Sequence, residues 1–523
     1  MNHIELFSGC GGLSLGLDKA GFELTFANEL SPMAAETFAY NLLGEDLDNL
    51  ANQNKKSDNS YWISSQFDDL SRRLRENPLE YPELGNGITD IPDDPKLIKG
   101  KLIIGNIIQL NQILESRPKL LKEIKSGFDS NGVDLVSGGP PCQSFSLAGL
   151  RKKNCDKNSL PWEFAKFVGM VQPKFVVLEN VSGILRPFKE GDINYYAWFE
   201  VAKAFAGKGY IPLCLHINAR LAGVPQNRPR FIMIGVREDI YQNLSTTFND
   251  VENSLFSTCI NLFNDIKTGK NIIFNNYHCF DAMDPNDYEL FHKSFLSFLI
   301  GEAEVSVKDA IHDLRLTHKS KKSNFVKNLN DQFEAVLPKK VTIDNHEQRK
   351  NSSLVKRRFR IYQVLQKHSK GINKQVFSIL KGESSSLSDG AWTALKKHKY
   401  MSEEGSYTLF NSKLDFIRFL SRHPTKKRTQ RALDPSEPAP AALSIPDDAC
   451  HYDDHELRTL TVREMARIQS FPDSFVFRSK VTTGGKKRRF EVPQYTQVGN
   501  AVPPLLGLRL GQAITNLLNR VSI

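Results

Sequence analysis

Short apolar runs recur through the first 240 residues, and they end at glycine, proline or a polar side chain. The runs lack the alternation of polar and apolar positions that is typical of a strand with one solvent-exposed face, so they predict strands that are buried on both faces. Residues 1–30 read as a strand, a glycine-rich turn, a helix and a second strand. Further strands are predicted at 101–105, 133–137, 175–178 and 231–235, with helices at 161–171 and 196–207 and a closing helix from Pro504 to about Leu518. The pattern predicts an α/β fold.

Two stretches depart from this rhythm. Residues 45–97 are rich in Asn, Asp, Ser and Pro, which predicts a polar surface insertion within a first domain at 1–236. Residues 237–457 are polar, basic and irregular, and we interpret them as a separate recognition domain. Residues 458–492 would link that domain back to the first, and residues 493–523 would complete the first domain with the closing helix.

The composition limits the class of protein. Hydrophobic residues make up 40% of the 523 residues and charged residues 24%, which is ordinary for a soluble globular protein. No run approaches the roughly 20 apolar residues of a membrane helix, and the first residues lack the features of a signal peptide. Seven cysteines are scattered without a Cys-x-x-Cys pair, which argues against a disulfide framework or a zinc site. We expect a cytoplasmic protein with no metal and no membrane partner.

The net charge is +10, and the excess is clustered in the second half of the chain. Basic clusters occur at 319–322, 356–360, 426–428 and 486–489. Any one cluster could be a solvated loop, but clustered cations suit a polyanion, and phosphate contacts dominate nucleic-acid affinity. The charge therefore favours a nucleic-acid partner.

The predicted strand at 133–137 is followed by a cysteine. It continues as Gly138-Gly139-Pro140-Pro141-Cys142, so the cysteine follows the carboxyl end of a strand, where open α/β sheets place ligands and catalytic groups. The two prolines stiffen the segment that carries it. A lone cysteine after a turn is more often simply buried, so this position gains weight only from the rest of the chain.

A glycine-rich turn and a carboxylate follow the first two strands. The turn is Phe7-Ser8-Gly9-Cys10-Gly11-Gly12-Leu13, and the second strand ends at Glu29-Leu30. Glycines between a strand and a helix let a ligand approach the backbone, and an acid at the end of the next strand can accept both ribose hydroxyls. The pair indicates a nucleoside cofactor, with Glu29 as an ordinary surface acid as the alternative. The spacing departs from the dinucleotide and P-loop patterns.

Further polar groups follow two later strands. Glu179 ends the strand at 175–178, and Arg228 and Arg230 precede the strand at 231–235, on one side of an extended segment. Glutamate is almost never fully buried unless paired, and arginine offers fork donors for carbonyl or phosphate oxygens. A thiol, a carboxyl group and two guanidinium groups are thus expected near one edge of the sheet.

The ordered set of motifs resembles the cytosine-C5 DNA methyltransferase family of bacterial type. The set is Phe-x-Gly-x-Gly-Gly, Pro-Pro-Cys-Gln, Glu-Asn-Val, Gln-x-Arg-x-Arg, then Arg463-Glu464 to Pro472, then Gln497 to Pro504. The resemblance covers most of 1–236 and 457–523. It implies a Rossmann-like methyltransferase domain that uses S-adenosylmethionine, and a target-recognition domain at 237–457.

The resemblance also implies roles for single residues. Cys142 would be the nucleophile that adds to C6 of a flipped-out cytosine, Glu179 would hydrogen-bond N3 and the exocyclic amine, Arg230 would hold the base carbonyl, and Arg228 would support the loop. Phe7, Glu29 and Asn500 would contact the cofactor. The full cofactor set is Phe7, Ser8, Gly9, Gly11, Gly12, Leu13, Glu29, Leu30, Asn106, Ile107, Pro140, Asn500, Ala501 and Val502. Asn106 stands where the family usually has Asp, so we expect adenine to be recognised with changed affinity.

The resemblance implies double-stranded DNA as the partner, with a cognate restriction endonuclease that is not tightly bound, and a monomeric protein at the bacterial nucleoid. Two alternatives stay open. One is an RNA cytosine-C5 methyltransferase of the same fold, which the length of 237–457 disfavours. The other is a catalytically silent DNA-binding module, which the presence of all four catalytic candidates disfavours. A dinucleotide-dependent oxidoreductase would leave Cys142 and the arginine pair unexplained.

Overall fold

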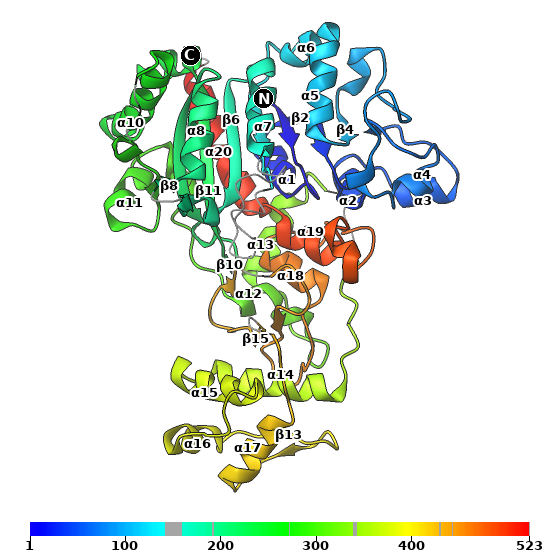
Figure 1. Ribbon diagram of the computed structural model, residues 1–523, viewed down its shortest axis with the longest axis vertical. Coiled ribbons are helices and arrows are strands. Elements are labelled where there is room, and N and C mark those ends of the chain that lie inside the picture. Colours follow the sequence, from blue (N-terminus) through cyan, green and yellow to red (C-terminus); the bar gives the residue numbers. More distant parts are fainter. Residues whose placement is uncertain are drawn as a thin grey trace.

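The centre of the protein is a nine-stranded sheet (Figure 1). The computed structural model describes residues 1–141, 159–190, 193–270, 272, 274–337, 342–427, 430–441 and 443–521. The strand order is β12 (Phe280–Asp281), β9 (Tyr210–Asn218), β11 (Pro229–Arg237), β6 (Phe175–Val181), β5 (Leu135–Gly138), β1 (Asn2–Leu6), β2 (Glu23–Glu29), β4 (Lys101–Ile104) and β3 (Ser60–Trp62). Neighbouring strands run parallel except β11, which is antiparallel to both β6 and β9. The predicted α/β fold and the predicted strands are confirmed.

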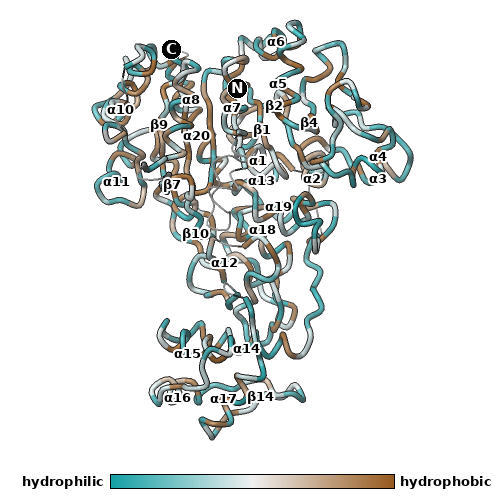
Figure 2. The backbone as a smooth tube through the Cα atoms, in the orientation of Figure 1, coloured by the Kyte–Doolittle hydropathy of each residue, from teal (hydrophilic) through white to brown (hydrophobic). Residues whose placement is uncertain are grey.

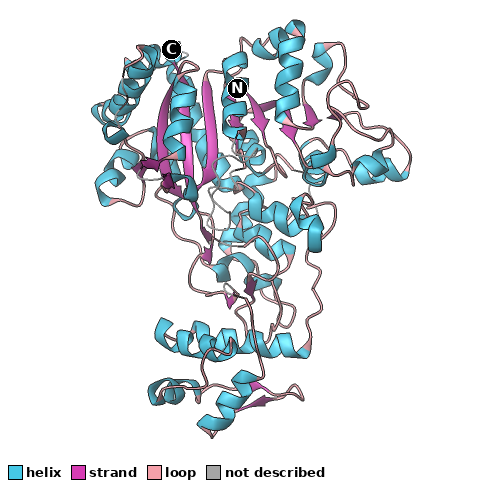
Figure 3. Cartoon of the chain, in the orientation of Figure 1, coloured by secondary structure: helices cyan, strands magenta, loops and turns pink. Residues whose placement is uncertain are grey.

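Helices cover both faces of this sheet (Figure 3). Along β5, Leu135 belongs to one buried cluster and Val136 to the other, which explains why the strands show no polar alternation. The cluster on one face includes α5 (Ile107–Ser116), α6 (Pro118–Lys125), α7 (Leu160–Val171) and α8 (Ala197–Ala206). The cluster on the other face includes α1 (Gly12–Lys19), α9 (Glu238–Ser245), α11 (Pro285–His292) and α20 (Pro504–Val521). α10 (Asp250–Lys267) packs against β9 and α8.

Helices α1 and α20 approach each other closely because glycine lines their contact. A Cβ atom added at Gly16 would lie 2.4 Å from the backbone nitrogen of Leu508 and 2.5 Å from the carbonyl oxygen of Pro504. The C-terminal helix is thereby held directly against the helix that follows the glycine-rich turn. The predicted closing helix is confirmed, and it extends to Val521.

The segment 45–97 is more ordered than a surface loop. It contains α3 (Leu47–Asn52), β3 and α4 (Leu70–Arg73), and β3 forms the edge of the main sheet. Its polar residues pair within the segment: buried Glu45 accepts hydrogen bonds from the backbone of Asp58 and Asn59, and buried Glu76 accepts one from Gln66. These buried carboxylates accept hydrogen bonds from backbone N–H groups, so a polar residue in this segment does not mark solvent exposure. α2 (Pro32–Leu42) packs over this end of the sheet.

The part of the chain that builds on the main sheet continues beyond residue 236. α9, α10, α11 and β12 all pack on the sheet, and β12 pairs with β9, so the elements that pack on the sheet continue past residue 237. The apolar positions of α10 fall at helical spacing, at 255, 256, 259, 262 and 263. That periodicity was the signal by which the helix could have been found.

The second half narrows away from the sheet (Figure 1). Its upper part contains α12 (Val307–Ile311), α13 (Asn324–Phe333), α18 (Val462–Ile468) and α19 (Gln494–Asn500). Two short strand pairs accompany it: β10 (Gln226–Asn227) with β16 (Ala439–Pro440), and β15 (Arg431–Ala432) with β17 (Ala449–Cys450). A third pair, β7 (Phe188–Glu190) with β8 (Ile193–Tyr195), lies between β6 and α8 in the chain.

The far end of the molecule is a helical module at residues 352–427. It contains α14 (Ser353–Gln366), α15 (Lys370–Leu380), α16 (Asp389–Leu395), β13 (Tyr400–Met401), β14 (Tyr407–Thr408) and α17 (Lys413–Ser421). A hydrophobic cluster of its own, around Phe359, Leu380 and Phe416, holds these helices together. The chain enters the module through the polar segment 346–352 (Figure 2). In the described residues, no helix is long and apolar enough to cross a membrane.

Candidate active site

The carboxyl ends of five parallel strands lie at one edge of the sheet. Leu6, the last residue of β1, is in register with Asn28 of β2 and Gly138 of β5, and Gly138 is in register with Leu178 of β6. Glu29 is in register with Ile104 of β4. The register brings most of the predicted site residues to this edge, because they follow these strands directly.

The glycine-rich turn is fixed by the predicted acid. The Gly9 backbone N–H donates to Oε2 of Glu29 at 2.8 Å, and the Ser31 N–H donates to Oε1 at 2.8 Å. Burial raises the pKa of Glu29, and these amide donors act against that rise. Phe7 and Gly9 adopt positive φ angles of 55° and 56°, so the chain turns sharply after β1. Each oxygen of Glu29 thus has a backbone donor and can still accept from a ligand.

Phe7 and Ser8 present different groups at this turn. The Phe7 ring packs edge-on to Phe164 with centroids 6.3 Å apart, and it is only partly buried. The hydroxyl oxygen of Ser8 is buried and has no hydrogen-bond partner among the described residues. A Cβ atom added at Gly9 would meet open space. The turn therefore leaves a polar group and free volume that a bound molecule could use.

The side chains of Leu13 and Leu30, two predicted cofactor residues, pack within the protein. Leu13 is 1% exposed within the cluster that joins α1 to the sheet, so its side chain belongs to the core. Leu30 is partly buried, and its carbonyl oxygen accepts from the Tyr81 hydroxyl at 3.3 Å.

Asn106 caps the helix after β4. Its side-chain Oδ1 accepts from the Ile108 N–H at 2.9 Å, at the N-terminus of α5. Asparagine and aspartate are equally good N-caps, so the substitution for the family's Asp keeps the turn and removes the charge. The Ile107 side chain is buried beside it. Asn28 links the neighbouring strands by donating to the carbonyl oxygens of Ile103 and Gly105.

The C-terminal segment closes the same edge. Arg228 donates through Nη2 to the carbonyl oxygens of Gly499 at 2.9 Å and Ala501 at 3.0 Å. A Cβ atom added at Gly12 would lie 2.3 Å from the Val502 carbonyl oxygen, so the segment touches the glycine-rich turn. Asn500 lies between these contacts with an exposed side chain.

Glu179 and Arg230 form a buried ion pair. They come from the antiparallel strands β6 and β11, and Arg230 Nε lies 2.6 Å from Glu179 Oε1. Their exposed fractions are 9% and 8%. Burial lowers the pKa of Arg230, and Glu179 opposes this effect; burial and the neighbouring Arg230 lower the pKa of Arg228. Two buried cations and one buried carboxylate leave an excess of positive charge at this point.

The segment that leads to Cys142 lies directly over this ion pair. A Cβ atom added at Gly139 would lie 3.0 Å from Glu179 Oε2. Asn180 donates through Nδ2 to the Pro140 carbonyl oxygen at 3.0 Å, and Pro140 is buried. Cys142 itself lies outside the described residues. Asn180 is a positioning residue to which sequence reasoning assigned no role, although it stands next to Glu179 in the Glu-Asn-Val motif.

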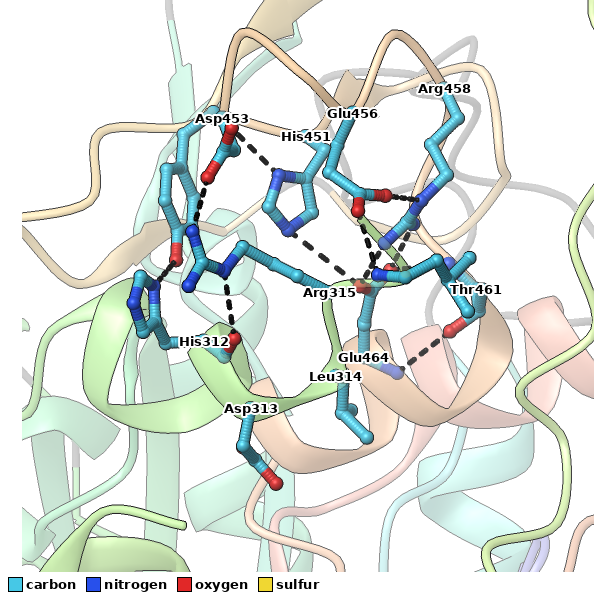
Figure 4. A network of polar contacts seen from close by, with 12 residues as sticks. His312, Asp313, Leu314, Arg315, His451, Asp453, Glu456, Arg458, Thr461 and Glu464 are labelled. Atoms are coloured by element: carbon cyan, nitrogen blue, oxygen red, sulfur yellow. Dashed lines mark hydrogen bonds and ion pairs between the residues drawn. The ribbon is translucent and has the colours of Figure 1, made fainter. Parts of the chain in front are cut away.

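A polar network joins residues 312–315 and residues 451–458 to α18 (Figure 4). Glu464 belongs to the capping box of α18 with Thr461, and Arg458 binds its carboxylate with two hydrogen bonds of 2.7 Å. Burial acts against the charge of Glu464, but Arg458 prevails and the pKa falls to about 2. His451 accepts from the Asp453 N–H through Nδ1 at 3.0 Å, so its Nε2 carries the proton and faces Glu464 at 3.7 Å. Glu464, in the motif at 463–472, therefore has a structural role: it holds the preceding segment against α18.

Comparison of the chain with models of known protein families identifies its family. The sequence profile of the family described as C-5 cytosine-specific DNA methylase matches residues 1–70 and 114–516. The chain belongs to this family. The predicted family is confirmed, and the unmatched residues 71–113 overlap the segment that forms the β3 edge of this methylase's sheet.

Individual relatives match this chain over almost its full length. The type II methyltransferase M.DdeI of Desulfomicrobium norvegicum is 26% identical over 528 residues, which cover 100% of this chain and 90% of the relative. The type II methyltransferase M.Bpa9945I of Bacillus paralicheniformis is 27% identical over 542 residues, 99% of each chain. Among solved structures, a candidate DNA modification methyltransferase encoded within an Escherichia coli prophage matches at 20% identity and a TM-score of 0.47, covering 99% of both chains.

Proposed function

We propose that this DNA cytosine methyltransferase transfers a methyl group from S-adenosylmethionine to C5 of one cytosine within a specific duplex sequence. The observation that carries the proposal is the buried Glu179–Arg230 ion pair beneath the segment that leads to Cys142. A carboxyl group and a guanidinium group at one point match the N3–amine edge and the carbonyl of a cytosine.

Cys142 is the proposed nucleophile. Its thiolate adds to C6 of the base, and the proton that Glu179 supplies at N3 neutralises the ring, so C5 becomes electron-rich. After C5 takes the methyl group, removal of the C5 proton restores the C5–C6 double bond and expels the Cys142 thiolate, and N3 returns its proton to Glu179. Covalent addition divides one difficult step into easier ones. The base must leave the helix to reach these groups, so the mechanism includes base flipping.

The excess of positive charge at Arg228 and Arg230 supports this chemistry. A nearby cation lowers the pKa of a thiol and favours the reactive thiolate. Arg230 would hold the base carbonyl. Arg228 is occupied by the carbonyl oxygens of Gly499 and Ala501, so its role is to hold the C-terminal segment at the site.

The residues at the glycine-rich turn fit S-adenosylmethionine. This cofactor, when bound, supplies an electrophilic methyl group. Glu29 would accept the ribose hydroxyls, and Phe7 would stack on the adenine. The unpartnered Ser8 hydroxyl and the open space at Gly9 support a ligand at this turn. Asn106, Ile107, Pro140 and residues 500–502 would complete the pocket.

The biological setting is modification of host DNA in a restriction–modification system or by a solitary methyltransferase. The type II names of the relatives support this setting. The protein would act as a monomer, with no lasting contact to an endonuclease.

A transfer assay tests the proposal. Labelled S-adenosylmethionine is incubated with duplex DNA or with transfer RNA, using the wild type, Cys142→Ala and the control variant Cys279→Ala, which replaces a partly buried cysteine outside the candidate site. We expect label in DNA only, from the wild type and Cys279→Ala. Label in RNA alone, or an active Cys142→Ala protein, would contradict the proposal.

A further inference from the structure

The helical module at 352–427 holds the entire net charge of the protein. It contains 16 Lys and Arg against 5 Asp and Glu, a net charge of +11, while the whole chain carries +10. The other 447 residues together carry a net charge of −1. A charge so concentrated, on a unit with its own hydrophobic core, indicates a specific anionic partner for this unit.

The basic cluster at 356–360 is largely used within the protein. Arg360 is buried, donates to the Lys399 carbonyl oxygen and lies 3.7 Å from Asp454. Arg357 contacts His423, and Arg358 donates to the Pro424 carbonyl oxygen. This cluster therefore stabilises the module, and the surface for a partner lies elsewhere.

Helix α15 presents a row of lysines to solvent. Lys370 and Lys374 of α15 and Lys381, the residue that follows its last turn, are exposed and stand four and seven residues apart. At 100° per residue they fall within about 40° of one another, and the row is about 16 Å long. The buried residues of the helix, Val376, Ile379 and Leu380, lie on its opposite face. Within the described residues, Lys381 lies 4.0 Å from Glu383, and no ion pair is found for Lys370 or Lys374.

The chemistry of this row fits phosphate. Protein interfaces are depleted of lysine, whereas lysine binds phosphate as a point charge. One DNA strand presents about five phosphates over the length of the row. The module carries further exposed lysines for which no carboxylate partner is found in the described chain: Lys367, Lys396, Lys397, Lys399 and Lys426.

We propose that the lysine row of α15 is a sequence-independent docking surface for the phosphates of duplex DNA that flanks the methylated site. The inference rests on the proposed function. The module lies at the far end of the molecule from the sheet, with α12, α18 and β15 between them (Figure 1). Because duplex DNA is stiff over this scale, phosphates held there belong to DNA away from the reacting cytosine.

The test measures DNA affinity as a function of salt for the wild type and the triple variant K370Q/K374Q/K381Q. Two duplexes are used, one that the wild type methylates and one of unrelated sequence. Each phosphate contact adds about 0.9 to the slope of log affinity against log salt, so three contacts add about 2.7. Between 50 and 200 mM salt, the wild type should lose about 40-fold more affinity than the variant, on both duplexes.

The matched control is K56Q/K267Q/K293Q, which removes the same charge from exposed lysines of the catalytic half. It should keep the wild-type slope, and both variants should keep the wild-type melting temperature. An unchanged slope for the α15 variant, an equal fall in the control, or a loss confined to the methylated duplex would overturn the inference. Failure of the proposed function would appear separately, as wild-type protein that binds DNA and transfers no methyl group.

Discussion

Replacing Gly16 by alanine should push apart the two helices that carry the cofactor turn and the C-terminal segment. The new Cβ would lie 2.4 to 2.6 Å from backbone atoms of Leu508, Pro504 and Gly507. An ordinary contact at this point is at least 3.4 Å, so α20 must retreat by about 1 Å. Backbone on both sides leaves no side chain that could rotate away.

Such overpacking costs about 1–3 kcal/mol, and we expect the upper part of that range because the clash is with backbone. The gain in helix propensity from Gly to Ala, about 1 kcal/mol, offsets only part of the cost. Since α20 begins just after residues 500–502, affinity for S-adenosylmethionine should fall together with the melting temperature. Both are measured, by calorimetric titration and by thermal unfolding followed by circular dichroism.

Gly390→Ala is the matched control. Gly390 also lies in a helix, α16, and an added Cβ there would meet nothing within 4 Å. It should leave cofactor affinity unchanged and keep or slightly raise the melting temperature. A Gly16→Ala protein with the stability and cofactor affinity of the wild type would refute the close α1–α20 contact.

Three further variants probe the site. Glu179→Gln should lower single-turnover methyl transfer by about 100-fold or more while DNA binding persists, because the base loses its proton donor; near-normal rates would remove Glu179 from the mechanism. Arg228→Ala removes two charged hydrogen bonds, each worth about 1.5–3 kcal/mol, so cofactor affinity should fall, and an unchanged affinity would separate Arg228 from the closing segment. Burial raises the pKa of Glu5 to about 8, so unfolding releases a proton at intermediate pH; the stability of the wild type relative to Glu5→Gln should fall between pH 4.5 and 8 by about 1.4 kcal/mol per unit, as measured by melting at a series of pH values. A Glu5→Gln protein with the wild-type pH profile would show that Glu5 titrates normally.

The α/β core and the edge that bears the site were predictable because strand ends are marked in the sequence. Glu29 and Glu179 lie at the ends of apolar runs, and parallel pairing brings these strand ends to one edge of the sheet. Arg230 reaches Glu179 because β11 pairs antiparallel with β6. Arg228 could be placed at the site, but not its contact with residues 499–501, which depends on how the C-terminal helix packs.

Other features were hidden because polar residues were taken to be exposed. The hydrogen bonds of Glu45 and Glu76 fold the segment 45–97 onto the sheet. Arg360 stands in the densest basic cluster, yet it is buried and engaged. The more dispersed lysines of α15 are the exposed ones. Local charge density alone could not separate structural from solvent-facing cations.

The most direct test is base-resolution methylation mapping of unmethylated duplex DNA after incubation with S-adenosylmethionine and the protein, beside Cys142→Ala. We expect C5-methylated cytosines within one short sequence motif, made by the wild type and absent with the variant. Methylation by Cys142→Ala, or a wild type that leaves every cytosine unmodified, would contradict it.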